Sequence, residues 1–127
     1  MNAQTKITLN ELIKRKEQML EAKKTPKRQD LFVKSLGGVI TIEEPSRALV
    51  IEAQEMGTDV SDAYMVYQCV VEPNLKNAEL RDAFGCVEPI EIVDKIFSAG
   101  EVVSIAKQCL ELSGYIDGVS VADTLKN

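Results

Sequence analysis

The chain has 127 residues, 45% of them hydrophobic, and its formal net charge is −5. This length corresponds to one domain, which can bury roughly two-thirds of its unfolded surface. The charge is uneven, because residues 1–28 carry eight basic and three acidic side chains, whereas residues 29–127 carry seven basic and seventeen acidic ones. The strongly acidic part after residue 28 is a poor match for a nucleic acid.

The cysteine and histidine content argues against a zinc site. The chain has no histidine, and Cys69, Cys86 and Cys109 are far apart with no CxxC pair. Each cysteine lies in an apolar context, so we expect small buried hydrophobes and no reactive thiols. An odd cysteine count without a signal-peptide pattern fits a reducing cytoplasm. No apolar run reaches the roughly 20 residues of a membrane span. We therefore expect a soluble intracellular protein without a cofactor, a metal or a membrane contact.

The first predicted element is a basic helix that begins at Thr8, after frayed residues 1–6. Thr8 and Glu11 have the spacing of a capping box. Pro26 forbids continuation of the helix, so we expect residues 1–29 to form a basic helix and a solvated linker, partly detached from the rest. So few apolar residues make the helix marginal alone, and it could order on a partner. Its thin apolar stripe consists of Leu9, Leu12, Ile13, Met19 and Leu20.

Residues 30–44 contain the one clear β signal, because two runs rich in β-branched residues flank the pair Gly37–Gly38. Two glycines suit a two-residue hairpin turn, which needs positive φ, and this turn pairs Leu36 with Val39. A lone hairpin is marginal in water, so its aliphatic face must lie on the helices or pair with another chain. That face presents Leu31, Val33, Ile40 and Ile42.

Helical periodicity dominates the chain after the hairpin. Tyr64 and Tyr67 lie at core spacing, and their alternative role is contact with a partner. The predicted helices run from Pro45 or Ser46 to about Met56, from Asp59 or Ser61 to about Val71, and from Asn77 to Phe84.

The most regular segment spans residues 88–115 and predicts two helices joined at residues 97–100. Ser98 and Glu101 fit a capping box, and Gly114 suits a left-handed residue that ends the second helix. An apolar arc of roughly 180° predicts that the second helix packs on several neighbours. The arc consists of Val102, Val103, Ile105, Ala106, Cys109, Leu110 and Leu112.

The expected fold class is mainly α with one β-hairpin, an α+β arrangement of several small helices. We divide the chain into a basic N-terminal helix and linker (residues 1–29), a folded domain (residues 30–116) and a loose tail (residues 117–127).

No catalytic site is predicted, and we expect a protein that is not an enzyme. Histidine is absent as a general base, and no serine or cysteine has a recognisable base partner. The neighbouring carboxylates are better explained as a strand end, an exposed helix face and favourable charge near a helix N-terminus. These pairs are Glu43 and Glu44, Glu52 and Glu55, and Glu88 and Glu91.

Three blocks of the sequence resemble the XkdN-like phage tail assembly chaperones. They are VKSLGGVITIEEPSRAL (residues 33–49), AELRDAFGCVEPIEIVDKIFSAGEV (residues 78–103) and LELSGY (residues 110–115). The resemblance covers roughly residues 30–116 and leaves the basic helix and the tail least covered. It implies a non-enzymatic chaperone that binds the tape measure protein and assists tail-tube assembly, with the tail tube protein as a further candidate partner. It also implies action in the bacterial host cytoplasm and absence from the mature virion.

The partner-binding surface is a separate hypothesis. A tape measure segment is expected to be a long amphipathic helix, which needs a groove for its apolar anchors. The candidate contact residues are Leu31, Val33, Ile40, Ile42, Tyr64 and Tyr67. The alternative function is a small intracellular adaptor whose basic helix binds an acidic partner. Free hairpin edges could also pair two chains into a homo-oligomer.

Overall fold

The structure, a computed structural model, describes residues 4–122. Over that part of the chain it confirms a mainly helical α+β class, with a three-stranded antiparallel sheet in place of a lone hairpin. The parts of the expected frayed start and loose tail at residues 1–3 and 123–127 lie outside the described residues. The elements are α1 (Leu9–Lys14), α2 (Lys16–Ala22), β1 (Arg28–Val33), β2 (Gly38–Glu43), α3 (Arg47–Glu55), α4 (Thr58–Cys69), β3 (Val70–Glu72), α5 (Ala78–Ala83), α6 (Glu91–Ile96) and α7 (Ala99–Leu112).

The hairpin has a wider turn than the sequence predicted. Leu36 does not pair with Val39; Val39 lies opposite Phe32, and residues 34–37 form the turn. A two-residue turn of the predicted type needs positive φ at both central positions, but in the glycine pair only Gly37 has it, at 61°. The observed register differs from the predicted one by an even number of residues, so the faces of the strands are unchanged.

The third strand was missed, because helical periodicity suggested that the preceding helix continues to about Val71. Helix α4 ends at Cys69, and β3 pairs with β2 through Val70 opposite Ile42. Pro73 disfavours a helical conformation at the residue before it, and Val70 is buried with 5% of its surface exposed. The helix also begins earlier than predicted, at Thr58.

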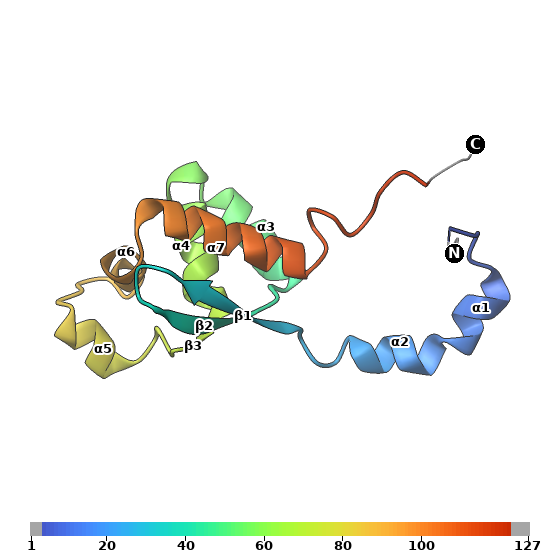
Figure 1. The fold of residues 1–127 in the computed structure, drawn as a ribbon, viewed down its shortest axis with the longest axis horizontal. Coiled ribbons are helices and arrows are strands. Elements are labelled where there is room, and N and C mark those ends of the chain that lie inside the picture. Colours follow the sequence, from blue (N-terminus) through green and yellow to red (C-terminus); the bar gives the residue numbers. More distant parts are fainter. Residues whose placement is uncertain (1–3, 123–127) are drawn as a thin grey trace.

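Helices α3, α4, α6 and α7 form a layer on one face of the sheet. Helix α7 lies across β1 and β2, and α4 packs against α7 and is flanked by α3 and α6 (Figure 1). Within residues 4–122, no polar or charged residue is buried, and the buried hydrophobic residues form one core cluster. The largest side chains that are fully buried are Ile42, Leu75, Ile92, Val66, Val93, Cys69 and Cys109.

The local signals predicted for the two ends of α7 are present. The capping box at the start of α7 is present, with the Ser98 amide donating to Glu101 Oε1 at 2.9 Å and the Glu101 amide donating to Ser98 Oγ at 3.3 Å. Gly114 ends the helix with φ of 82°. The Tyr115 amide donates to the Leu110 carbonyl at 2.9 Å, as in a Schellman motif. These bonds fix both ends of the helix that covers the sheet.

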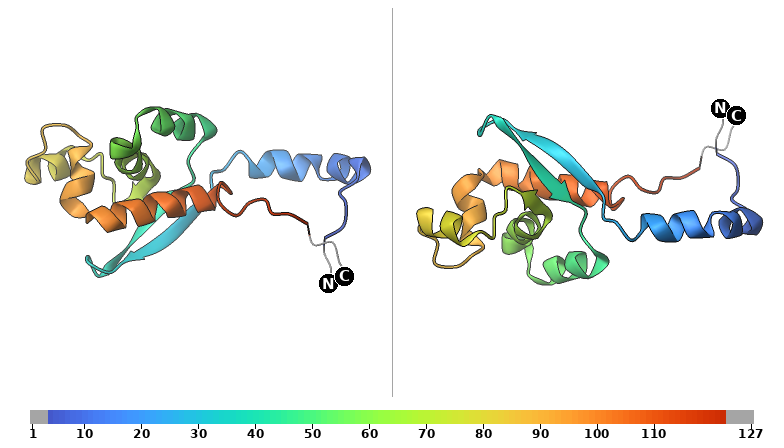
Figure 2. Two further views of the ribbon diagram at one scale, coloured as in Figure 1. Left: turned by 90° about the horizontal axis from the view of Figure 1, so that it is seen from above. Right: turned by 90° about the horizontal axis from the view of Figure 1, so that it is seen from below.

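The basic segment at the start of the chain stands apart from this domain. Helices α1 and α2, which we call the arm, contain no buried residue and project away from the sheet (Figures 1 and 2). The predicted single helix is interrupted at Arg15, although Thr8 caps its start by accepting from the Glu11 amide at 3.2 Å. The arm joins β1 where the Lys27 amide donates to Glu44 at 2.9 Å and Arg28 pairs with Glu43 at 3.1 Å.

Candidate functional site

A groove of about 380 Å³ lies between β1 and α7, and we call it the strand groove. Leu31 and Val33 from the strand and Ile105 from the helix provide its apolar lining. Val33 and Ile105 are buried, whereas Leu31 is half-buried. The charged lining residues are Lys34 and Glu101, so the two charges cancel. The groove is therefore a neutral and largely apolar surface.

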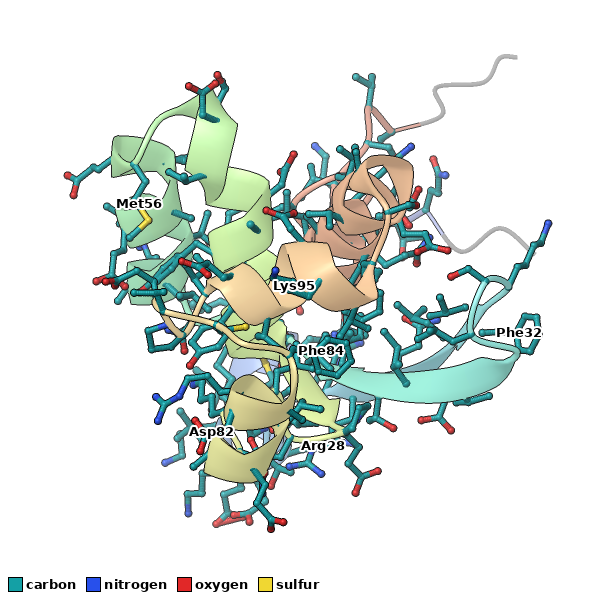
Figure 3. The ribbon with its side chains drawn as sticks, turned by 90° about the vertical axis from the view of Figure 1, so that its left-hand side faces the viewer. Arg28, Phe32, Met56, Asp82, Phe84 and Lys95 are labelled. Atoms are coloured by element: carbon teal, nitrogen blue, oxygen red, sulfur yellow. The ribbon has the colours of Figure 1, made fainter. Side chains whose placement is uncertain are left out.

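Exposed apolar side chains lie near this groove, some of them on the other face of the sheet. Phe32 is among the lining residues and is 64% exposed, and together with its cross-strand neighbour Val39, which is 60% exposed, it lies on the sheet face opposite Val33 and Ile40. Figure 3 shows the Phe32 ring on the hairpin, away from Phe84 and from Lys95. Val103, predicted to lie within the packed arc of α7, is 56% exposed. Large apolar groups left in water next to a groove are typical of interaction surfaces.

The hairpin tip is held against the start of α7. The Ser35 hydroxyl, in the turn, bonds to the Glu101 carboxylate, and together with the Ser98 backbone it holds the pKa of Glu101 below its usual value. The same carboxylate thus serves the helix cap and the turn. Glu101 also lines the strand groove.

A second groove, of about 670 Å³, lies between α3 and α4, and we call it the acidic groove. Its charged lining residues are Glu52 and Glu55, with no basic side chain among them. The Tyr64 hydroxyl donates to Glu52 Oε1 at 2.6 Å, and this bond together with burial raises the pKa of Tyr64. Ile51 adds an apolar side chain that is 47% exposed.

The arm carries a third apolar surface. Its stripe surrounds a notch of about 370 Å³ whose lining includes Lys16 beside four apolar residues. Among residues 4–122, Lys14 and Lys16 make no salt bridge, whereas Arg15 pairs with Glu11 at 3.1 Å. The five stripe residues, each between 42% and 74% exposed, are Leu9, Leu12, Ile13, Met19 and Leu20.

The predicted contact residues divide by burial. Val33, Ile40 and Ile42 are at most 5% exposed and belong to the core, so a partner could reach them only if the sheet left the helices. Leu31 is half-buried in the strand groove. The tyrosines Tyr64 and Tyr67 are also half-buried and lie on α4. Their role in binding stays a prediction.

Phe32 was not among the predicted contact residues, although the alternation of the strand had already placed it on the face opposite the aliphatic side chains. This outward-facing aromatic residue, Phe32, was the signal in the sequence that could have indicated the strand groove.

Tyr67, one of the predicted contact residues, already has a local partner. Lys76 Nζ lies 5.4 Å from the centre of the Tyr67 ring.

Four of the six neighbouring carboxylates have structural partners. Glu91 accepts from the Val87 and Glu88 amides at 3.2 and 3.1 Å, and so orders the chain before α6. Glu43 and Glu44 hold the base of the arm, and Glu52 holds Tyr64. Within residues 4–122, no group of three His, Cys, Asp or Glu side chains could hold a metal ion.

Two of the three cysteines are buried as predicted, and the third is half-buried. Cys69 on α4 and Cys109 on α7 are both buried and free, and Cys86 is half-buried. The Cys69 thiol also lies 3.6 Å from Met65 Sδ. A hydrogen bond between the two buried thiols lowers the pKa of Cys69, whereas that bond and burial raise the pKa of Cys109. The pair fills the contact between the two main helices.

These features describe a small α+β protein with the strand groove, the acidic groove and an uncovered arm. Helices long and apolar enough to cross a membrane are absent from residues 4–122. The sequence profile of the phage XkdN-like tail assembly chaperone proteins matches residues 3–125, and the chain therefore belongs to this family. The match confirms the resemblance found in the sequence and extends it to the arm and most of the tail.

Among solved structures, the crystal structure of the protein YqbN is similar. It is 19% identical, with a TM-score of 0.55, and the match covers 71% of this chain and 87% of that chain. At this identity the likeness concerns the fold alone. No curated protein sequence matches the chain.

Proposed function

We propose that this tail assembly chaperone binds the tape measure protein and assists assembly of the tail tube in the host cytoplasm, without catalysing a reaction. The observation that carries the proposal is the family match over residues 3–125. The tail tube protein is a further partner in the same process, and the chaperone leaves before the virion is complete.

The strand groove is the proposed docking surface. An amphipathic helix needs a hollow for anchors spaced three or four residues apart, with little charge at its centre. The strand groove is neutral and apolar, and Phe32 beside it is an exposed aromatic of the kind that dominates interface energetics. Of the six predicted contact residues, Leu31 and Val33 belong to this surface, and the half-buried Leu31 is the more accessible.

Binding is tested by copurification of the full chain with the cognate tape measure protein. Replacement of exposed Phe32 by Ser removes the aromatic anchor, and Ser104→Arg places a long charged side chain in the strand groove. We expect each substitution to weaken binding by about tenfold or more. The control is Val87→Ser, because Val87 is 84% exposed and lies outside the groove.

The readout also includes the solubility of the tape measure protein when the two proteins are co-expressed. If the tape measure protein is equally soluble and forms tubes equally well without this chain, the proposed function is wrong. If it needs the chain but Phe32→Ser and Ser104→Arg both bind normally, the function stands and the strand groove is not the docking surface. Salt-sensitive binding that disappears when residues 1–28 are deleted would favour the alternative adaptor that uses its basic arm.

A further inference from the structure

The arm has apolar surface that its own domain leaves uncovered. Five large aliphatic or methionine side chains lie along α1 and α2, and neither helix buries a residue. Short helices with so little support are marginal in water, and most of their stability must come from packing on another surface. The arm therefore lacks the packing contacts that would stabilise its two helices.

The acidic groove has the charge that complements the arm. Residues 4–24 carry six basic and three acidic side chains, whereas residues 47–69, which contain α3 and α4, carry one basic and four acidic ones. Lys14 and Lys16 are without salt bridges in the described chain, and the acidic groove offers Glu55 and the outer oxygen of Glu52. The strand groove is neutral by comparison, so charge favours the acidic groove.

The apolar parts and the lengths also agree. Ile51 and Leu49 line the acidic groove, and the first is 47% exposed. The arm from α1 to α2 is about 21 Å long and α4 about 18 Å, at roughly 1.5 Å per residue. An amphipathic helix that lies in a groove in this way is a common mode of protein recognition.

We propose that the arm of one copy docks in the acidic groove of a second copy of this chain. The base of the arm is held by the bonds of Lys27 and Arg28 to β2 and its end, which direct the arm away from its own domain (Figure 2). The two surfaces are different parts of the molecule, so the contact is head-to-tail and leaves a free arm at one end and a free groove at the other. Successive copies therefore form an open chain. This inference is separate from the proposed function, because it needs no tape measure protein.

The test is light scattering after size-exclusion chromatography of the full chain. We expect species larger than a dimer at about 100 µM and dissociation toward monomers as the salt concentration rises from about 0.05 to 0.5 M. The arm variant Leu12→Glu/Leu20→Glu and the groove variant Ile51→Lys/Glu55→Lys should each weaken association at least about tenfold per apolar residue replaced. All four side chains are exposed, and circular dichroism checks that both variants remain folded.

Mixing the two variants separates head-to-tail docking from every other arrangement. The arm variant keeps an intact acidic groove, and the groove variant keeps an intact arm, so an equimolar mixture should form a dimer that cannot grow further. The control Val87→Glu, at a site 84% exposed and far in sequence from both surfaces, should associate as the unmodified chain does.

Three results overturn the proposal. The unmodified chain could be monomeric at every protein and salt concentration tested, as expected if the arm folds back on its own domain or binds a different protein. Association could persist in both variants, which would place the contact elsewhere, for example at a sheet edge. The mixture of variants could remain monomeric, which would exclude the pairing of arm with groove.

Discussion

Ser98 takes part in both bonds of the capping box at the start of α7. Its hydroxyl accepts from the Glu101 amide and its own amide donates to the Glu101 carboxylate, so the first turn of α7 depends on it. Replacement by alanine should lower the free energy of unfolding by about 1 kcal/mol, a usual cost of losing an N-cap. Urea unfolding measures the change.

The matched control is Ser104→Ala, six residues further along the chain and within α7. Ser104 is exposed and makes no hydrogen bond among those of the described side chains, and alanine is the better helix former. This variant should therefore be as stable as the unmodified chain or slightly more stable. Equal losses in the two variants would mean that the cap contributes nothing.

Single residues explain why some features could be predicted and others could not. Ser98, Glu101 and Gly114 act through bonds to backbone only a few positions away, so their spacing in the sequence was sufficient. Val103 has the same hydrophobicity as its buried neighbour Val102, yet it is 56% exposed. The exposure of Val103 depends on which other elements cover α7. The sequence around Val103 does not contain this information.

At the scale of elements, the same lesson applies to the sheet. The hairpin faces were predicted correctly because alternation survives an even change in register, whereas the turn needed the φ values of Gly37 and Gly38. Strand β3 is only three residues long and is stabilised by pairing with β2. A strand whose main support is a partner distant in sequence leaves little local signal.

The arm and the domain are elements of different stability, and two leucines offer a matched test. Leu75 is 2% exposed in the core, whereas Leu20 on the arm is 60% exposed. At a protein concentration low enough to keep the chain monomeric, Leu75→Ala should lower the free energy of unfolding by about 2 to 5 kcal/mol. Leu20→Ala should change it by less than about 0.5 kcal/mol.

Thermal or urea unfolding of both variants gives the comparison. A large loss at Leu20 in the dilute monomer would mean that the arm packs on its own domain. That result would contradict the division of the chain at the linker.

At the scale of the whole molecule, charge and exposed apolar surface are distributed together. The basic arm buries none of its own residues, and the acidic domain has grooves that remain open. The molecule therefore combines a compact domain with uncovered apolar surface on both the arm and the domain. The strand groove could not be predicted from the sequence because two elements far apart along the chain form it, and the acidic groove could not because it depends on how two consecutive helices pack. The strand groove joins residues near 32 to residues near 105, and the acidic groove joins α3 to α4.

Hydrogen exchange distinguishes the two units of the molecule directly. In a dilute sample, the amides of α1 and α2 should exchange almost as fast as those of an unfolded chain, because no burial supports their helical bonds. The amides of α4 and α7, which enclose the core, should exchange only through unfolding of the whole domain. As concentration rises, protection should appear in the arm and in α3 together, since the proposed contact orders one and covers the other. Protection of the arm that is already complete in the monomer would instead show that the arm folds on its own domain.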